Sequence, residues 1–296
     1  MLSILIPVYN YDIFPLVKVL NEEAIRMELI FEILCLDDAS DNMEIQNRNK
    51  LVRKFDSCVF EILTENIGRS KIRNKLAKKA HFENLIFLDA DVLPVRQGFI
   101  KSYLDAIAIN EVIFGGISYP KISDSFKRCL HYKYGKNREA LSFNKRINTQ
   151  SNNFTSANFA IKKNLFKKVK FNETFKTYGF EDILFSKDLL LNDYKIAQID
   201  NSIVHNGILE NNNDYIQKQH ESLETLHKLY FNNDLEDRDV RLLSYYSLLK
   251  KIGISNLYLI FFKLTKKNLL KNLKSKRPSL FLFDLYRLGY FCSIKN

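Results

Sequence analysis

The chain has 296 residues, of which 46% are hydrophobic, so it can bury a large core, and its composition excludes a disordered or collagen-like protein. Its formal net charge is +11. Residues 1–240 contain 33 basic and 33 acidic residues, so nearly the whole excess lies in the C-terminal tail, which disfavours nucleic acid as a partner of the main domain.

The first 110 residues alternate apolar segments with helical ones. Polar turns follow the predicted strands, which span residues 2–8, 31–36, 59–63 and 85–88. Helices are predicted near residues 13–27, 43–54, 69–81 and 97–109. This alternation indicates a mostly parallel sheet flanked by helices, in which the carboxyl ends of the strands form one ligand-binding edge.

Later segments continue the pattern. Residues 112–118 and 155–161 predict two further strands, and residues 199–207 predict a strand that delivers His205 at its end. A helix that carries Leu189 follows the turn at Gly179. No G-x-G-x-x-G or G-x-x-x-x-G-K segment is present, so a nucleotide must be held by other means.

Paired acids follow two of the predicted parallel strands. Asp37-Asp38 ends the second strand and Asp89-Ala90-Asp91 ends the fourth, so both pairs are expected near one cleft. Clustered carboxylates repel each other unless a cation or hydrogen-bond donors compensate them. A divalent ion bridging the phosphates of a nucleotide would do so. The structural alternative is that Asp41 or Asp91 only caps a helix.

Four segments in this order resemble the signature of family 2 glycosyltransferases, which have the GT-A fold. The segments are Ser3-Ile4-Leu5-Ile6-Pro7-Val8-Tyr9-Asn10, Leu36-Asp37-Asp38-Ala39-Ser40-Asp41, Asn66-Ile67-Gly68 running into Ile72-Arg73-Asn74, and Phe87-Leu88-Asp89-Ala90-Asp91. Each segment alone is a weak signal, whereas the ordered set is specific. The resemblance extends to about residue 207.

The resemblance implies a nucleotide-diphosphate sugar as donor, usually a uridine one. It implies that Pro7, Tyr9 and Asp38 contact the base and ribose, and that Asp89-Ala90-Asp91 is the D-x-D element, which binds Mn²⁺ or Mg²⁺ with the donor diphosphate. The residues predicted to bind the nucleotide are Pro7, Tyr9, Asp38, Asn66, Arg73, Asp89 and Ala90. Arg69 and Arg73 share a helix face and could reach a phosphate, although that helix is basic throughout and could simply be solvated.

The resemblance also assigns the acceptor side of the site. The Glu181-Asp182 pair resembles the motif of the family in which the aspartate is the general base, so Asp182 is the predicted base and Glu181 its positioning neighbour. Acids at a helix start are also favoured by the helix dipole alone. His205 resembles the histidine that completes the metal site with Asp89 and Asp91, whereas a single histidine is more often a structural hydrogen-bonding group. An imidazole ligand suits Mn²⁺ better than Mg²⁺.

The tail is basic and amphipathic. Residues 241–277 hold ten basic residues and no acidic one, interleaved with apolar residues at roughly helical spacing. Such a helix can lie on an anionic membrane surface, or it can pack on the main domain with a solvated lysine face. Charge and periodicity do not separate the two interpretations, and no apolar run approaches the ~20 residues of a spanning helix.

The sequence thus predicts a catalytic domain over residues 1–235 and a helical basic region over residues 236–296. The predicted enzyme is an inverting hexosyl- or N-acetylhexosaminyltransferase that acts on a glycan or lipid-linked acceptor. The resemblance to the family implies a role in polysaccharide biosynthesis. One alternative is a nucleotidyltransferase, which would normally carry a glycine-rich loop near the first strand. The other is a non-catalytic membrane- or nucleic-acid-binding module.

The predicted location is the cytoplasm, with peripheral attachment to the inner face of the membrane left open. Met1 to Tyr9 has no basic segment and contains Pro7, so it does not resemble a signal peptide. The four cysteines show no C-x-x-C spacing, which fits a reducing compartment. The sequence does not indicate the sugar, the acceptor or the oligomeric state.

Overall fold

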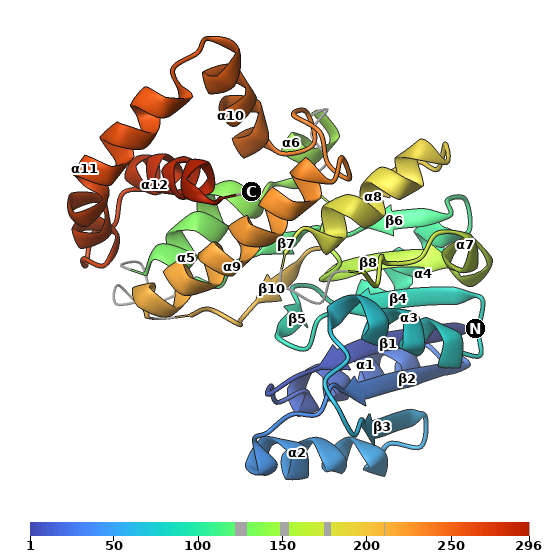
Figure 1. Cartoon of the computed structure of the whole chain (residues 1–296). Coiled ribbons are helices and arrows are strands. Elements are labelled where there is room, and N and C mark those ends of the chain that lie inside the picture. The colour runs from blue at the N-terminus through green and yellow to red at the C-terminus, as the bar shows by residue number, and fades with distance from the viewer. Residues whose placement is uncertain (122–128, 149–153, 175–178, 210, 296) are drawn as a thin grey trace. The chain divides into compact units, whose positions relative to one another are not determined.

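The computed structural model describes residues 1–121, 129–148, 154–174, 179–209 and 211–295 (Figure 1). The chain divides into two compact units. Unit 1 comprises residues 1–120, 140–176 and 181–207, and unit 2 comprises residues 121–139, 177–180 and 208–296. The boundary predicted at residue 235 rested on charge and stays a prediction.

Unit 1 alternates strands with helices through its first half, as predicted. In chain order its elements there are β1 (Leu2–Val8), α1 (Phe14–Arg26), β2 (Phe31–Asp37), α2 (Met43–Asn49), a 3₁₀ turn (Lys50–Lys54), β3 (Cys58–Ile62), α3 (Arg69–Lys79), β4 (Asn84–Leu88), β5 (Val92–Pro94), α4 (Phe99–Ile107), β6 (Val112–Phe114) and β7 (Ile117–Ser118). The second half contributes α6 (Phe143–Asn148), β8 (Asn158–Lys162), α7 (Lys163–Lys168), α8 (Glu181–Leu191), β9 (Ile196–Gln198) and β10 (Ile203–His205).

The main sheet has seven strands in the order β3-β2-β1-β4-β8-β6-β9. Strands β3, β2, β1 and β4 run parallel, and β8 runs antiparallel to both of its neighbours. Because β1 is flanked by parallel strands and covered on both faces, nearly every one of its residues is buried, which explains its unbroken apolar sequence. The mostly parallel α/β sheet predicted from the sequence is confirmed.

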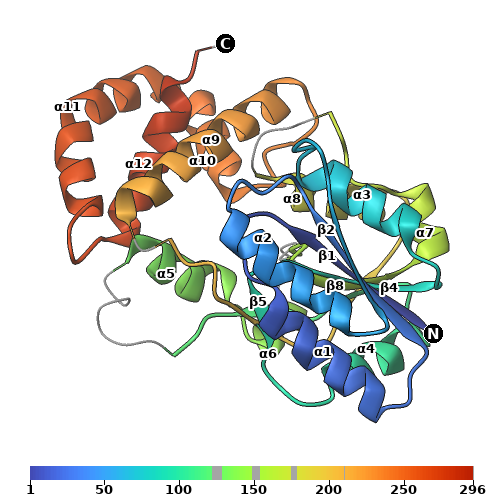
Figure 2. The same cartoon turned by 90° about the horizontal axis from the view of Figure 1, so that it is seen from below.

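Helices cover both faces of this sheet (Figure 2). On one face, α1 and α4 pack into a core that includes Leu16, Leu20 and Ile100. On the other face, α3, α7 and α8 pack into a second core that contains Leu76 and a cluster of phenylalanine rings around Phe185. These two layers fix where the carboxyl ends of β1, β2 and β4 emerge.

A small second sheet follows the end of β4. Strand β10 pairs antiparallel with β5, which places His205 opposite Val92, and pairs parallel with β7. The main-chain N–H of Asn206 donates to the carbonyl of Asp91 at 2.8 Å and extends the contact. Pairing of β5 with β10 therefore brings a histidine from late in the chain beside the D-x-D segment.

The single strand predicted over residues 112–118 is wrong, because the chain divides there into β6 and β7, which belong to different sheets. Gly115 and Gly116 separate the two strands. A side chain at Gly115 would overlap the Tyr103 hydroxyl and Asn158, and Gly116 has a φ of +94°, which favours glycine. The two glycines thus allow a close approach and a sharp change of direction.

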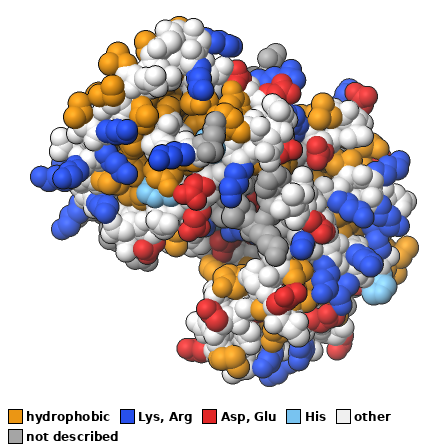
Figure 3. Space-filling view, viewed as in Figure 1, with side chains coloured by type: hydrophobic (Ala, Val, Ile, Leu, Met, Phe, Trp, Pro, Cys, Tyr) orange, Lys and Arg blue, Asp and Glu red, His pale blue; other side chains and the backbone are white. Residues whose placement is uncertain are grey.

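Unit 2 is helical, with α5 (Leu130–Tyr134), a π-helical turn (Gly135–Glu139), α9 (Asn212–Phe231), α10 (Arg241–Lys251), α11 (Ser255–Leu273) and α12 (Leu280–Ser293). Its core contains Phe262 of α11 and Phe283 of α12, and Gly289 lies so close to the Phe262 ring that a Cβ atom would overlap it. Hydrophobic and basic side chains both appear on the surface of these helices (Figure 3). No helix among the described residues is both long and apolar enough to cross a bilayer.

Asn158 joins three segments of unit 1. Its side chain is fully buried, and its Nδ2 donates to the carbonyls of Gly116 and Asn201 at 2.8 and 2.9 Å. Its Oδ1 accepts the Tyr103 hydroxyl at 2.7 Å. This amide therefore ties the start of β8 to the β6–β7 glycines and to the segment that leads into β10.

We expect Asn158→Ala to lower the free energy of unfolding by about 2–4 kcal/mol, because the buried carbonyl of Asn201 loses the Asn158 donor and the carbonyl of Gly116 keeps only the N–H of Ile203. Urea unfolding followed by tyrosine fluorescence measures the change. Asn164→Ala is the matched control, since Asn164 is exposed on α7 and its side chain makes no hydrogen bond to a described residue. Equal stability of Asn158→Ala and the wild type would contradict this structural role of the amide.

Candidate active site

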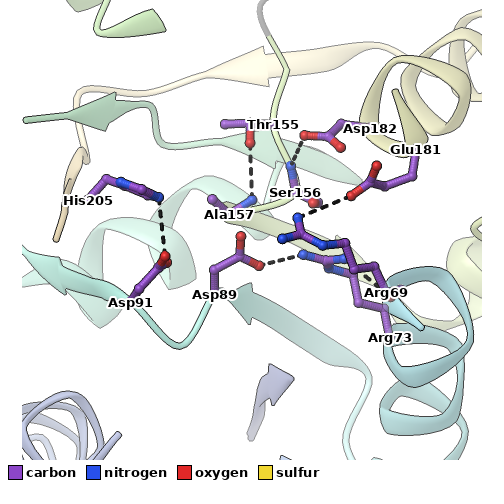
Figure 4. Close-up of polar contacts among 10 residues, drawn as sticks. All are labelled: Arg69, Arg73, Asp89, Asp91, Thr155, Ser156, Ala157, Glu181, Asp182 and His205. Carbon is purple, nitrogen blue, oxygen red and sulfur yellow. Dashed lines mark hydrogen bonds and ion pairs between the residues drawn. The ribbon is translucent and has the colours of Figure 1, made fainter. Parts of the chain in front are cut away.

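A buried arginine connects α3 with the end of β4. Arg73 is 2% exposed, and its Nη2 donates to Oδ1 of Asp89 at 2.5 Å (Figure 4). Its guanidinium also lies over the Phe171 ring and donates to the carbonyl of Arg69. Because the charge of Arg73 is compensated chiefly by Asp89, the ion pair fixes both side chains at the carboxyl edge of the sheet.

The first turn of α8 supplies the two acids of the acceptor-side motif. Asp182 Oδ2 accepts the main-chain N–H of Ser156 at 3.3 Å, and Glu181 Oε1 lies 3.5 Å from Nη1 of Arg69. The N-terminus of a helix favours both negative charges. The main-chain N–H of Asp89 donates to the carbonyl of Ala157 at 3.2 Å, so the Ser156–Ala157 segment contacts both Asp89 and Asp182.

The pKa of Asp182 is raised to about 6. Burial is the largest cause, the charges of Glu181 and Asp89 add to it, and the Arg73 charge and the Ser156 hydrogen bond oppose it. A carboxyl group with a pKa near neutrality accepts a proton more readily than an ordinary aspartate does and is still mostly ionised at pH 7. Asp182 thus has the electrostatic character of a general base.

Asp91 and His205 face each other on the other side of Asp89. Asp91 Oδ2 lies 3.3 Å from His205 Nε2, and both side chains are mostly buried, at 28% and 16% exposed. The Tyr119 ring packs near the imidazole, with its centroid 5.5 Å away. A side chain at Gly207 would overlap the Asp91 carboxylate, so a larger residue there would have to displace Asp91.

The Asp91–His205 pair fits a divalent ion of the Mn²⁺ type, because a carboxylate and an imidazole at this distance are two of the ligands that such ions take. No group of three or more His, Cys, Asp or Glu side chains is gathered for a metal within the described ranges. Asp89 instead engages Arg73, so its predicted role as a ligand stays a prediction. The phosphates of a bound nucleotide could supply further oxygen ligands.

The residues predicted to bind the base and ribose lie at the end of β1 and on the loops after β1 and β2. Pro7 is near the end of β1, and Tyr9 follows it with 52% of its side chain exposed. Asp38 is 5% exposed, and its two oxygens accept the main-chain N–H groups of Ile67 and Gly68 at 2.7 and 3.0 Å. Asp38 therefore orders the loop that leads into α3.

The remaining predicted donor residues occupy two different positions. Asn66 is exposed on the loop before α3, whereas Ala90 is buried between the two acids of the D-x-D segment. Asp89, Asp91, Asp182, Arg73 and His205 therefore gather in one region, and Asp38 and Asn66 adjoin it through the start of α3.

Some side chains that shape these loops were not predicted from the sequence. Asn10 Oδ1 accepts the main-chain N–H groups of Asp41 and Asn42, and the hydroxyl of Ser40 accepts the N–H of Asn10 at 2.8 Å. Asn10 has a φ of +48°, a conformation that asparagine tolerates better than most residues. The sequence signal that could have indicated this role is the asparagine directly after Pro7-Val8-Tyr9, at the end of the first strand.

Two further residues received no specific role from the sequence, although Asp37 was named as one of the paired acids. Asp37 is fully buried and accepts the N–H of Ser40 at 2.7 Å, while its Oδ2 has no hydrogen-bond partner among the described residues. Tyr11 has a pKa raised by burial and, to a smaller extent, by the charges of Asp91 and Asp12. No local pattern distinguished Tyr11 from an ordinary core tyrosine.

Residues 3–170 match the model of the family described as glycosyl transferase family 2, which is more than half of the chain. The match covers β1 to α7 and therefore the D-x-D segment and all the predicted nucleotide-binding residues. Glu181, Asp182 and His205 lie beyond it. No curated protein matched the chain.

Solved structures of glycosyltransferases resemble the chain. Residues 1–349 of TarS from S. aureus have a TM-score of 0.50 and 19% identity, with 97% of this chain and 90% of that one covered. GalNAc-T7 with UDP, GalNAc and Mn²⁺ has a TM-score of 0.52 and 15% identity, with 71% and 44% covered. At these identities the similarity shows a shared fold, and it confirms the predicted GT-A architecture.

A mannosyltransferase from Pyrobaculum calidifontis in complex with GDP-Man and Mn²⁺ has a TM-score of 0.49 and 16% identity, with 77% of this chain and 63% of that one covered. The present chain thus spans less than two thirds of the length of that mannosyltransferase and less than half of the length of GalNAc-T7.

The raised pKa of Asp182 predicts how stability changes with pH. Between its ordinary value of 3.8 and about 6, the folded chain holds a proton that the unfolded chain has lost, so the free energy of unfolding falls as the pH rises through this window. Asp182→Asn removes the titrating carboxyl group and therefore this loss of stability. We expect the variant to be more stable than the wild type by about 1–2 kcal/mol at pH 7.5 and equally stable near pH 4.

Urea unfolding in metal-free buffer at the two pH values measures this difference. Asp105→Asn on α4 is the control, because the Asp105 side chain is 65% exposed and its substitution leaves pH dependence nearly unchanged. A stability gain that grows toward low pH would contradict the expected direction of the effect.

Proposed function

Because the chain belongs to glycosyl transferase family 2, we propose that it transfers a sugar from a nucleotide-diphosphate donor to a hydroxyl group of a glycan or lipid-linked acceptor. The expected donor is a UDP-sugar and the expected sugar a hexose or an N-acetylhexosamine. The observation that supports this proposal is the gathering of Asp182, with its raised pKa, and the Arg73–Asp89 pair beside Asp91 and His205.

The proposed reaction is a single displacement. The acceptor oxygen attacks the anomeric carbon of the donor sugar, the bond from that carbon to the diphosphate breaks, and the nucleoside diphosphate leaves. Asp182 takes the proton of the acceptor hydroxyl as the new bond forms. One displacement at one carbon inverts its configuration.

Asp91 and His205 would hold the divalent ion, Mn²⁺ or Mg²⁺, and GalNAc-T7 was solved with Mn²⁺ bound. When bound, such an ion neutralises negative charge on the diphosphate. Asp89 would take part as the first residue of the D-x-D element, held in place by Arg73.

Arg69 and Arg73 both provide positive charge at the same edge, and only that of Arg73 is fixed by burial. Arg73 is buried and already oriented, so it can face the charge that develops on the leaving diphosphate without reorganising. Arg69 is half exposed and lies beside Glu181, which gives it room to approach a phosphate. Preorganised charge of this kind is the largest catalytic contribution that such a site can make.

The loops after β1 and β2 would bind the base and ribose. Asn10 holds these two loops together, and Asp38 holds the second of them to the start of α3. Pro7, Tyr9 and Asn66 then lie on a frame whose geometry is set by main-chain hydrogen bonds. The frame is consistent with donor binding near Asp89 and Ala90.

Two other functions are less well supported. A nucleotidyltransferase would use a glycine-rich phosphate loop after the first strand, and the loop in this chain is Pro7-Val8-Tyr9-Asn10. A non-catalytic binding module does not require a carboxylate whose pKa is raised to about 6 beside two other acids. Cytoplasmic location follows from neither observation and stays a prediction.

Asp182→Asn is expected to lower kcat by about 10²–10⁴-fold while leaving donor affinity nearly unchanged, because the substitution removes the base and not a donor contact. In the wild type, kcat/KM should fall below pH 6 as Asp182 becomes protonated. A radiolabelled transfer assay with isothermal titration of UDP measures both quantities. Full transfer activity in Asp182→Asn would overturn the assignment.

Asp91→Asn is expected to weaken Mn²⁺-dependent UDP binding by at least about tenfold, because an amide is a poorer ligand than a carboxylate. Gly207→Ala should act in the same direction, since its methyl group displaces the Asp91 side chain. Calorimetry with UDP and Mn²⁺ measures the affinity, with Asp105→Asn as control. Unchanged Mn²⁺-dependent affinity in both variants would exclude a metal site at Asp91.

The donor itself can be found without knowing the acceptor. When no acceptor is present, water can slowly attack the anomeric carbon of a bound nucleotide sugar in its place. A hydrolysis screen across UDP-, GDP- and other nucleotide sugars, with and without Mn²⁺, therefore identifies the donor. Asp91→Asn serves as the inactive reference. Hydrolysis of no nucleotide sugar by the wild type would count against the proposed reaction.

A further inference from the structure

Helix α11 has two apolar faces, and only one of them is covered by described residues. Phe262, Leu269 and Leu273 form its inner face and are nearly fully buried against α12. The residues of its outer apolar face, spaced three and four apart along one stripe, are Leu257, Ile260, Phe261 and Leu264, with exposed fractions of 65%, 55%, 46% and 77%. Packing of unit 2 accounts for the first face and leaves the second unexplained.

The turn between α10 and α11 extends the outer stripe. Leu248, Ile252 and Ile254 are exposed there by 51%, 56% and 39%. Gly253, with a φ of +75°, makes the turn, and nothing lies within 4 Å of the position its Cβ atom would take. Exposed apolar residues that are contiguous over a turn and two helical segments are unusual for a surface that contacts only water.

A row of lysines runs beside this stripe. Lys263, Lys267, Lys271 and Lys274 follow one another at helical spacing, are all exposed, and form no ion pair with a described residue. Lys251, which is not in this row, forms an ion pair with Asp237 at 3.8 Å. Hydrophobic and basic side chains lie together over this region in Figure 3.

We propose that the outer face of α11, with the α10–α11 turn, docks on the surface of an anionic lipid bilayer. The apolar stripe would enter the boundary between headgroups and acyl chains, and the lysine row would contact anionic headgroups. We call this set of residues the α11 surface: Leu248, Ile252, Leu257, Ile260, Phe261, Leu264, Lys263, Lys267, Lys271 and Lys274.

The composition of the surface favours a bilayer over the other occupants. In a symmetric dimer through this face, the lysine rows of two copies would be brought together with no acid in residues 241–277 to compensate them. A nucleic acid would be attracted by the lysines and would leave the exposed leucines without a partner. A bilayer offers negative charge and an apolar layer next to each other, which matches both parts.

The inference goes beyond the proposed glycosyl transfer and does not depend on it. Docking is a property of α10 and α11, and no residue of the candidate active site belongs to them. If the chain does act on a lipid-linked acceptor, the α11 surface would hold the enzyme at the interface where that acceptor lies.

The test is co-sedimentation of the full-length protein with extruded vesicles. Vesicles of phosphatidylcholine alone are compared with vesicles that contain about 30% phosphatidylglycerol. We expect binding to the anionic vesicles to exceed binding to the neutral ones by about two orders of magnitude, and to fall when salt is raised from about 0.1 to about 0.5 M.

Two variants separate the parts of the surface. A charge variant carries Lys263→Gln, Lys267→Gln, Lys271→Gln and Lys274→Gln. It should lose about two to three orders of magnitude in partitioning to anionic vesicles.

A stripe variant carries Leu257→Ser, Phe261→Ser and Leu264→Ser. It should lose at least about tenfold on the same vesicles. All the substituted residues are exposed, so the circular dichroism spectrum and thermal transition should match those of the wild type.

Two matched control variants carry the same kinds of substitution at exposed positions of unit 1. Four exposed lysines, Lys54, Lys78, Lys167 and Lys170, are replaced by glutamine in the first control. Ile25→Ser and Ile109→Ser form the second control, since these side chains are 59% and 85% exposed. Both controls should partition within about twofold of the wild type, because short-range contact with the bilayer and not total charge or total apolar surface drives the docking.

Three outcomes would overturn the proposal. The wild type could fail to bind anionic vesicles, or the charge and stripe variants could bind as well as it does. Sedimentation velocity could instead show a dimer that the stripe variant abolishes, without vesicle binding, which would assign the surface to a second copy. None of these outcomes bears on donor hydrolysis, so the proposed reaction stands or falls separately.

Discussion

The architecture of the candidate site depends on how one buried cation is compensated. Arg73 lies inside the carboxyl edge of a parallel sheet, 2% exposed, and Asp89 is its ion-pair partner. Without Arg73, Asp89 and Asp182 would face each other with no buried positive charge between them, and the pKa of Asp182 would be raised further. The pair thus makes it possible to gather several acids where a nucleotide diphosphate and an acceptor would meet.

The second constraint is strand pairing around the D-x-D segment. Strand β5 follows Asp91 directly, and its antiparallel register with β10 places His205 opposite Val92. Before β10, the side chain of Asn158 binds the carbonyls of Gly116 and Asn201. The absence of a side chain at Gly115 and Gly116 lets these segments pack closely. A side chain as distant in sequence as His205 is consequently fixed within 3.3 Å of Asp91 by main-chain geometry and not by local preference.

The family match and the site overlap only in part. The matched residues 3–170 contain the segments that would bind the donor, whereas Asp182 and His205 lie after them. The family match therefore covers the D-x-D segment and the predicted nucleotide-binding residues, whereas Asp182 and His205 rest on short sequence motifs and on their geometry. Unit 2 adds a basic helical surface to which neither the fold of unit 1 nor the proposed chemistry assigns a role.

The sequence by itself located the first four strands of unit 1 and the helices α1 to α4, with their type. Apolar β-branched runs ended by polar turns located β1, β2, β3 and β4 to within about a residue, because a strand buried on both faces must be apolar throughout. The D-x-D segment, Glu181-Asp182 and His205 were also identified from short patterns. Such patterns name residue types and spacing, and they carry no information on which side chains meet.

Only the tertiary structure showed which side chains are in contact. The split of residues 112–118 into β6 and β7 follows from what surrounds Gly115, which no local rule contains. The engagement of Asp89 by Arg73 arises because α3 packs against the sheet beside the end of β4. For α11, periodicity showed an amphipathic helix, but only its packing against α12 showed which apolar residues are buried and which remain in contact with solvent.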